Sequence, residues 1–297
     1  MGVLAVAALA VSAACGSSVA GGSRGNGGSD EPTVAAGVHL SGTQNYLPAR
    51  AADVYLPSGR TAAPVVVLVP GGAWQTADRS GLSGLSEYLA TAGLVVVNTT
   101  HRAAADGGTF PGPVQDVTCS VNFAVQRARE AGLAVTSVVL LGHSSGAHLA
   151  ALAALAPERF QGKCPYPRAS IDALVGMAGS YDVERLDFLA ESFFGTARED
   201  APQAWTEGNP LTWARRAGGR QGLRVLLLHG SDDTDLPTDF TTDFATALRA
   251  GGHPVRVEIV PGATHQSIYL PPVSGARVVS WLRRGSAGTA QGRFSRR

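Results

Sequence analysis

Short apolar runs rich in β-branched residues alternate along this chain with segments of helical period, and this alternation constrains the fold most strongly. Residues 64–69, Pro-Val-Val-Val-Leu-Val, are continuously apolar, as in strands buried on both faces of a parallel sheet. Further strands are predicted at residues 94–98, 138–141, 171–177, 224–228 and 255–260. Helices are predicted at residues 81–91, 113–131, 147–155, 240–250 and 275–283. The pattern predicts an α/β fold with a mostly parallel sheet and helices on both faces.

The composition agrees with one globular domain, which we assign to residues 34–284. The 297 residues are 44% hydrophobic and carry a net charge of +1. Nucleic-acid-binding domains normally carry a strongly basic face, so we expect no nucleic-acid partner. Residues 181–220 lack a clean period and hold much of the aromatic content, which predicts a small lid-like insertion. Residues 285–297 are polar and basic and are expected to form a flexible tail.

The first 33 residues differ from the rest of the chain. Residues 3–14 are uncharged and apolar, but shorter than the ~20 residues of a membrane-spanning helix. Two alanines then precede Cys15, so the segment resembles a bacterial lipoprotein signal, with Ser12 where Leu is usual and no basic residue before Arg24. Residues 16–33 are Gly/Ser-rich and predict a flexible linker. We expect an exported protein attached to the membrane only through a lipid on Cys15; an ordinary cleaved signal peptide, giving a secreted protein, is the alternative.

The cysteine count fits this expectation. If Cys15 is lipidated, Cys119 and Cys164 remain as an even pair in an oxidising compartment. A disulfide between them is one interpretation, and two buried free thiols are the other.

A serine between two glycines is the first candidate for chemistry. Residues 142–146 read Gly-His-Ser-Ser-Gly and fit the nucleophile-elbow pattern G-x-S-x-G. The pattern alone is weak, since residues 21–25 in the linker match it as well. Only the copy at 142–146 lies between a predicted strand and a predicted helix, where glycines two residues either side of the serine avoid a steric clash. We therefore identify Ser144 as the candidate nucleophile; a serine that only caps a helix is the alternative.

A Gly-Gly pair follows the apolar run at 64–69. Residues 70–74, Pro-Gly-Gly-Ala-Trp, resemble the oxyanion loop of carboxylesterases of the hormone-sensitive-lipase family, which reads His-Gly-Gly-x and is often followed by Trp. The resemblance implies that the N–H groups of Gly72, Ala73 and Ser145 stabilise the oxyanion of acyl transfer. Pro70 stands where the family has a histidine that holds the loop. A plain turn at the end of a strand is the alternative.

The acid and the base are expected after later strands. Residues 229–237, His-Gly-Ser-Asp-Asp-Thr-Asp-Leu-Pro, resemble the family's acid loop H-G-x-x-D-x-x-V-P, which selects Asp233 over Asp232 and Asp235. His265 follows the strand predicted at 255–260, where the base of such a triad stands, whereas His253 precedes that strand. The remaining histidines of these motifs are assigned to packing: His143, His148 and His229. None of the histidines shows metal-ligand spacing, so no metal is expected.

The resemblance covers roughly residues 50–283 in the family's order. It includes residues 100–103, 110–117, 179–182 and 209–212. Residues 142–149 are also similar to small esterases that include kynurenine formamidases and feruloyl or acetyl esterases. The resemblance implies the α/β-hydrolase fold.

The function that this resemblance implies is hydrolysis of a carboxylic ester with a modest acyl group, through an acyl-enzyme on a Ser144–Asp233–His265 triad, without a cofactor. The insertion at 181–220 is expected to supply an apolar pocket. An amidase such as a formamidase or peptidase, using the same triad, and a catalytically silent binding protein with the same fold are the alternatives. The sequence leaves the oligomeric state open.

Overall fold

The computed structural model describes residues 38–216 and 222–292, with side chains as far as residue 285. The expected signal segment, Cys15 and the linker lie outside the described residues. No helix within the described ranges combines the length and the apolar composition needed to cross a membrane.

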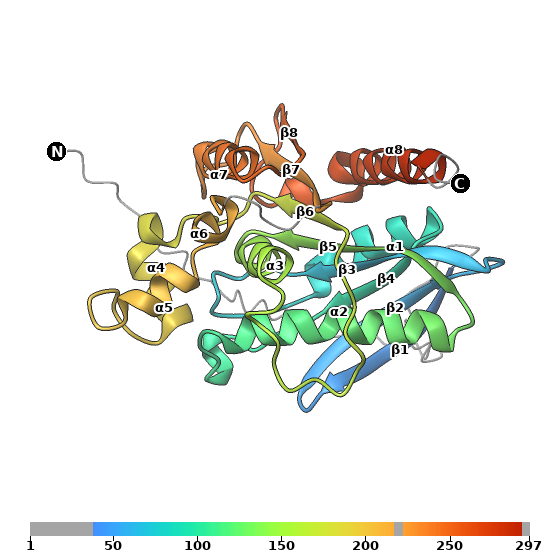
Figure 1. The fold of residues 1–297 in the computed structure, drawn as a ribbon, viewed down its shortest axis with the longest axis horizontal. Helices are drawn as coiled ribbons and strands as arrows, with labels where there is room; N and C mark the ends of the chain where they lie inside the picture. The colour runs from blue at the N-terminus through green and yellow to red at the C-terminus, as the bar shows by residue number, and fades with distance from the viewer. Residues whose placement is uncertain (1–37, 217–221, 293–297) are drawn as a thin grey trace, which may run out of the picture. The chain divides into compact units, whose positions relative to one another are not determined.

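An eight-stranded sheet forms the centre of the fold, with the strand order β1-β2-β4-β3-β5-β6-β7-β8 (Figure 1). The strands are β1 (Val38–Leu47), β2 (Arg50–Pro57), β3 (Ala62–Val69), β4 (Val95–Thr99), β5 (Ala134–His143), β6 (Ala173–Met177), β7 (Arg224–Gly230) and β8 (Val255–Val260). β1 and β2 are antiparallel to their neighbours, and β3 to β8 are parallel to one another. The predicted mostly parallel sheet is confirmed.

Helices cover both faces of this sheet, as predicted (Figure 1). α1 (Ser83–Thr91) and α8 (Ala276–Gly292) pack on one face, and α2 (Gly112–Glu130), α3 (Ser145–Leu155) and α7 (Asp239–Ala250) pack on the other. Successive residues of a strand point to opposite faces. Val67 of β3 therefore belongs to the core under α2 and α3, while Val66 and Leu68 belong to the core under α1 and α8. Burial on both faces explains the continuous apolar runs.

The strand register brings four loops to one edge of the sheet. Val69 lies opposite Gly142, so the loop after β3 begins beside the turn after β5. Gly230 lies opposite Val260, so the loops after β7 and β8 also begin side by side. Because parallel strands end at a common edge, the four segments with candidate motifs all meet there.

The insertion after β6 contains three short helices, α4 (Asp187–Phe194), α5 (Pro202–Glu207) and α6 (Pro210–Ala214). The insertion contributes to the pocket through leucines and not through its aromatic side chains. Phe193 and Trp205 are buried in the core, and Phe194 stacks on Trp205 at 4.2 Å between ring centroids. Leu186 and Leu189 line the pocket instead. Large aromatic rings bury more apolar area inside the fold than at a pocket rim.

The last helix is longer than predicted. We expected it to end at Arg283 and the tail from Gly285 to be flexible, but α8 continues to Gly292. The segment from 285 to 292 contains no proline, and a glycine inside a helix costs only about 1 kcal/mol relative to alanine. The helix therefore continues past Gly285 despite its weak propensity.

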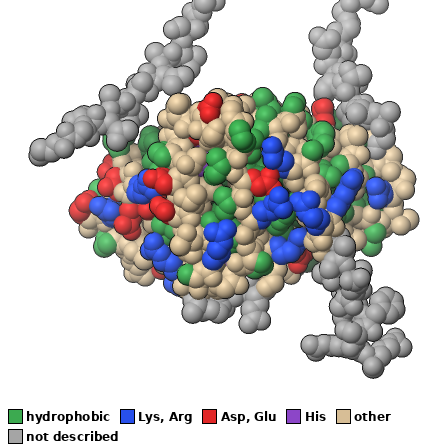
Figure 2. Space-filling model, turned by 90° about the horizontal axis from the view of Figure 1, so that it is seen from above, with side chains coloured by type: hydrophobic (Ala, Val, Ile, Leu, Met, Phe, Trp, Pro, Cys, Tyr) green, Lys and Arg blue, Asp and Glu red, His purple; other side chains and the backbone are tan. Residues whose placement is uncertain are grey.

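Arginines gather on the face formed by β8 and α8, to the right of centre in Figure 2. The exposed members are Arg256, Arg277, Arg283 and Arg284. Glu258 pairs with Arg256 at 2.6 Å and with Arg277 at 3.0 Å. Glu258 therefore offsets part of the positive charge of this patch.

A disulfide joins Cys119 of α2 to Cys164 in the segment after α3. Their Cα atoms are 5.5 Å apart and their separation in sequence is 45 residues. Of the two interpretations that the sequence left open, the structure contains the disulfide.

Candidate active site

Ser144 occupies the sharp turn between β5 and α3. Its backbone has φ of 53° and ψ of −125°, a conformation that is rare for a residue with a side chain. Its N–H donates to the carbonyl of Met177 at 2.9 Å, and its own carbonyl accepts from the N–H of Ala147 at 2.9 Å. Both hydrogen bonds hold the strained serine at the carboxyl edge of the sheet, as a nucleophile elbow requires.

The glycines two residues either side of Ser144 are required by close backbone contacts. A Cβ atom at Gly142 would lie 2.4 Å from the carbonyl oxygen of Gly146. A Cβ atom at Gly146 would lie 2.3 Å from the carbonyl oxygen of Pro70. The elbow is therefore packed directly against the start of the loop after β3.

Three side chains from three loops form a hydrogen-bonded chain. His265 Nε2 lies 3.0 Å from Ser144 Oγ, and His265 Nδ1 lies 2.8 Å from Asp233 Oδ2. The competing carboxylates Asp232 and Asp235 are exposed and take no part in this chain. The structure thus brings together the serine, histidine and aspartate selected from the sequence. Their arrangement allows His265 to take a proton from Ser144 while Asp233 holds its other nitrogen.

Asp233 is held as a carboxylate by four donors. Its Oδ1 accepts the N–H groups of Asp235 at 2.9 Å and of Leu236 at 2.8 Å. Its Oδ2 accepts from His265 and lies 3.1 Å from His229 Nε2. Burial raises the pKa of Asp233, but hydrogen bonds from the two histidines and from Leu236 outweigh it and lower that pKa well below its usual range.

Two histidines assigned to packing from the sequence touch this chain. His229 Nε2 lies 3.0 Å from the carbonyl oxygen of Leu236, which can only accept, so Nε2 carries the proton and Nδ1 accepts from the Thr241 hydroxyl at 2.7 Å. The same Nε2–H also faces Asp233 Oδ2 at 3.1 Å. His143 Nε2 lies 2.8 Å from the carbonyl oxygen of His265 and therefore donates to it. Burial, followed by the charge of His265, lowers the pKa of His143 to about 3, so this donor is neutral. The position of His143 next to Ser144 was the only sequence signal for its role.

The loop after β3 has an unusual backbone. Gly72, Ala73 and Trp74 have successive φ values of 139°, 51° and 60°. A Cβ atom at Gly72 would lie 2.5 Å from the carbonyl oxygen of Thr76, so only glycine fits. The N–H groups of Gly72 and Ala73 donate no hydrogen bond within residues 38–216 and 222–292. Ser145 opens α3, where the first N–H groups have no partner inside the helix. The geometry leaves these three donors free for an oxyanion.

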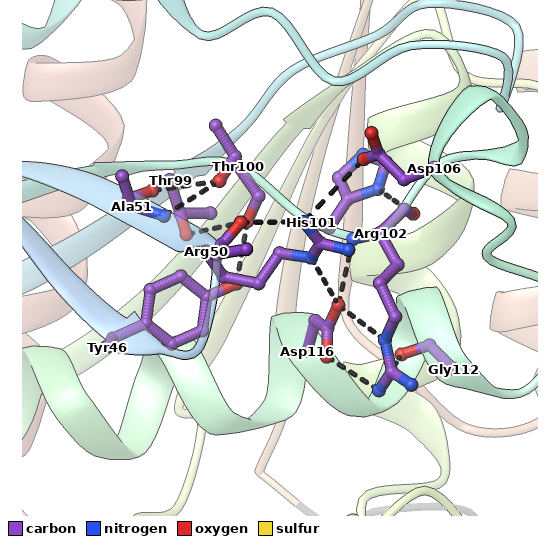
Figure 3. Close-up of polar contacts among 11 residues, drawn as sticks. Tyr46, Arg50, Ala51, Thr99, Thr100, His101, Arg102, Asp106, Gly112 and Asp116 are labelled. Atoms are coloured by element: carbon purple, nitrogen blue, oxygen red, sulfur yellow. Dashed lines mark hydrogen bonds and ion pairs between the residues drawn. The ribbon is translucent and has the colours of Figure 1, made fainter.

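The loop after β4 supports the outer side of the loop after β3, residues 70–74, which we call the Gly-Gly loop. Ala104 N–H donates to the carbonyl of Trp74 at 2.9 Å. This supporting loop is anchored by Asp116 of α2, which is 1% exposed and lies between Arg50 and Arg102 (Figure 3). The carboxylate accepts from Arg102 Nε at 2.9 Å and from its terminal nitrogen at 2.7 Å. A bidentate pair on a buried carboxylate of this kind helps to fix the position of the loop.

A cavity of about 490 Å³ opens over Ser144 and His265. Its lining, drawn from the described residues, holds no lysine or arginine. It combines four leucines with two carboxylates: Leu82, Leu186, Leu189, Leu236, Asp78 and Asp235. The volume suits a small ligand. The described residues contain no group of three or more His, Cys, Asp or Glu side chains that could hold a metal ion.

Comparison with known proteins identifies the family. The BD-FAE family matches residues 52–248, more than half of the chain, and the match includes Ser144 and Asp233. The chain belongs to the BD-FAE family. The sequence resemblance to α/β-hydrolase esterases is thereby confirmed.

Curated relatives of this BD-FAE family chain are esterases by name. The isoprenylcysteine alpha-carbonyl methylesterase of Arabidopsis thaliana is 29% identical over 240 residues, covering 76% of this chain and 56% of that protein. Esterase LipC of Mycobacterium tuberculosis is 30% identical over 218 residues, covering 68% of this chain and 53% of LipC. The chain therefore spans just over half the length of these relatives.

Solved structures agree on the fold. A truncated form of a carbohydrate esterase from gut microbiota superposes with a TM-score of 0.73 at 18% identity, covering 84% of this chain and 96% of that chain. The predicted α/β-hydrolase fold is confirmed.

Proposed function

We propose that this protein is a serine esterase that cleaves small carboxylic esters through an acyl-enzyme on Ser144. The observation that carries the proposal is the hydrogen-bonded chain Ser144–His265–Asp233, with distances of 3.0 and 2.8 Å, at the floor of a cavity beside free backbone N–H groups. The family membership and the esterase names of its relatives support the same chemistry.

The proposed reaction has two halves. In the first, Ser144 Oγ attacks the ester carbonyl while His265 Nε2 takes its proton, and the oxyanion accepts from the N–H groups of Gly72, Ala73 and Ser145. Collapse expels the alcohol, which takes the proton back from His265, and leaves an acyl group on Ser144. In the second half, His265 deprotonates water, which attacks the acyl carbonyl and releases the acid, and the proton returns to Ser144.

The test is hydrolysis of p-nitrophenyl acetate by the purified full-length protein and by its Ser144→Ala variant. We expect release of p-nitrophenolate by the wild type and a loss of roughly 10³-fold or more in the variant, as for other triad serines. Equal rates for the two proteins would contradict the proposal.

Amide cleavage by the same triad is examined with the matched anilide, p-nitroacetanilide. We expect the ester to react much faster than the anilide, because the anilide is chemically the less reactive acyl donor. Faster cleavage of the anilide would identify an amidase. Inertness toward both substrates would favour the catalytically silent binding protein.

We also propose that the protein is exported and anchored through a lipid on Cys15. The Cys119–Cys164 disulfide supports an oxidising compartment. Growth of producing bacteria with an alkyne-tagged fatty acid should label the wild type and leave Cys15→Ala unlabelled. Wild-type protein found unlabelled in the medium would show a cleaved, secreted form instead.

A further inference from the structure

The backbone of the Gly-Gly loop is unfavourable by itself. Ala73 and Trp74, at φ of 51° and 60°, both lie in the left-handed region that residues with a Cβ atom avoid. Such a conformation persists only where surrounding contacts determine it. Hydrogen bonds from Ala104 and Ala105 hold the loop on its outer side, at the carbonyls of Trp74 and Gln75. The inner side is held through the Trp74 side chain.

The Trp74 indole is 2% exposed and donates its N–H to His148 Nδ1 at 3.1 Å. His148 lies on α3, one turn beyond Ser144, and is fully buried. Its Nε2 lies 2.8 Å from the carbonyl oxygen of Gly208. An indole nitrogen can only donate and a carbonyl oxygen can only accept. The imidazole must therefore carry its proton on Nε2, and its Nδ1 is unprotonated. These two partners select one neutral tautomer.

Burial lowers the pKa of His148 to about 3, in agreement with that neutral form. A protonated imidazole would turn an N–H of Nδ1 toward the indole N–H and break the contact.

The contacts that run from Trp74 through His148 end at the insertion after β6. Gly208 lies between α5 and α6, and Phe193 of α4 stacks on the Trp74 ring at 5.8 Å and meets the His148 ring edge-on at 5.0 Å. The same insertion lines the cavity with Leu186 and Leu189. The segment that borders the substrate cavity therefore also contacts the residues behind the oxyanion loop.

We propose that Trp74 and His148 are positioning residues for the oxyanion hole. His148 accepts the indole N–H and donates to Gly208, and this fixes the left-handed backbone that presents the N–H groups of Gly72 and Ala73 to the oxyanion. The inference rests on the proposed ester hydrolysis. A displaced donor weakens binding of the transition state more than binding of the substrate, so kcat changes and KM does not.

The experiment compares Trp74→Phe, which keeps an aromatic ring on Phe193 but removes the donor, with His148→Leu, which removes both functions of the imidazole. We expect each to lower kcat for p-nitrophenyl acetate about 10- to 100-fold, somewhat less than deletion of an oxyanion donor, with KM within about twofold. A trifluoromethyl ketone, which forms a tetrahedral adduct with Ser144, should bind more weakly by the same factor.

Two further variants separate positioning from general damage. His148→Gln keeps one acceptor and one donor on its amide and should restore most of kcat. Trp213→Phe deletes a comparable indole hydrogen bond, to the carbonyl of Glu207 at 2.7 Å in the same insertion, and should leave kcat and inhibitor binding unchanged. In the double variant Trp74→Phe/His148→Leu, the two losses should not add, because the residues act as one unit.

The outcomes are distinct. Loss of kcat and of inhibitor affinity in Trp74→Phe and His148→Leu, with recovery in His148→Gln, supports the inference. If those two variants behave like Trp213→Phe while Ser144→Ala is inactive, the positioning role is wrong and the esterase proposal stands. If the wild type shows no Ser144-dependent hydrolysis, the esterase proposal fails and the inference fails with it.

Discussion

At the scale of single residues, the elbow shows how two glycines and one strained serine depend on one another. Ser144 adopts a positive φ in a tight turn, and backbone atoms leave no room for a side chain at Gly142 or at Gly146 on either side of it. The Gly146 side of the turn also contacts the carbonyl of Pro70, where the oxyanion loop begins. A methyl group at this position therefore disturbs both halves of the candidate site.

We expect Gly146→Ala to lower the free energy of unfolding by about 2–3 kcal/mol, since its Cβ would lie 2.3 Å from the Pro70 carbonyl oxygen. The forced shift of the oxyanion loop should reduce kcat/KM for p-nitrophenyl acetate at least about tenfold. Urea unfolding and steady-state kinetics measure the two effects.

Gly84→Ala is the matched control. Gly84 lies in α1, and a Cβ atom there would meet only the Pro271 ring, with Cγ at 3.6 Å and Cδ at 3.8 Å, both ordinary contacts. We expect unchanged activity and a free energy of unfolding that is unchanged or up to about 1 kcal/mol higher. Equal behaviour of the two alanine variants would contradict the close contact at Gly146.

At the scale of the elements, the site is assembled from loops and braced by helices behind them. Asp116 of α2 anchors the loop after β4, and the disulfide at Cys119 ties the same helix to the segment after α3. α2 thus connects two segments that are distant in sequence. Neither cysteine lines the cavity, so this connection should affect stability rather than chemistry.

The variant Cys119→Ala/Cys164→Ala should lower the free energy of unfolding by about 2–4 kcal/mol, because the bond closes a long loop in the unfolded chain. We expect kcat/KM at 25 °C to stay within about twofold of the wild type. Urea unfolding with and without dithiothreitol provides the measurement. The reduced wild type should approach the variant, and a wild type insensitive to reductant would argue against the disulfide in solution.

At the scale of the whole molecule, burial of histidines couples folding to pH. Burial lowers the pKa of His143 and of His148 to about 3, and it lowers the pKa of His101 and His253 as well. An unfolded histidine titrates near pH 6.5, so the unfolded chain binds more protons between about pH 3 and 6.5. Stability is therefore lost as the pH falls through that window.

Between pH 7 and pH 5 each histidine with a folded pKa of about 3 should cost about 2 kcal/mol of unfolding free energy. The lowered pKa of Asp233 also makes the free energy of unfolding fall as the pH falls, but only at more acidic pH. His148→Gln removes one titrating group, so its loss of stability between pH 7 and pH 5 should be smaller by about 2 kcal/mol. Parallel pH slopes for the variant and the wild type would contradict this assignment.

Much of the fold follows from local patterns. The β-branched runs and the helical segments between them determine a parallel sheet, because each run is too apolar to leave either face in water. The order of the motifs also determines which loops reach the carboxyl edge, and so which serine and histidine are candidates. Ser144 could be chosen over the serine in the linker because only one has a strand before it and a helix after it.

Tertiary structure alone decided the contacts between residues distant in the chain. The partners of His148, the donors around Asp233 and the bond between Cys119 and Cys164 all depend on where loops cross in space. Phe193, Phe194 and Trp205 of the insertion are buried in the core, because other elements of the fold pack around them, whereas Phe188 is 86% exposed. Local sequence determines which element forms, while these distances arise only when the elements pack.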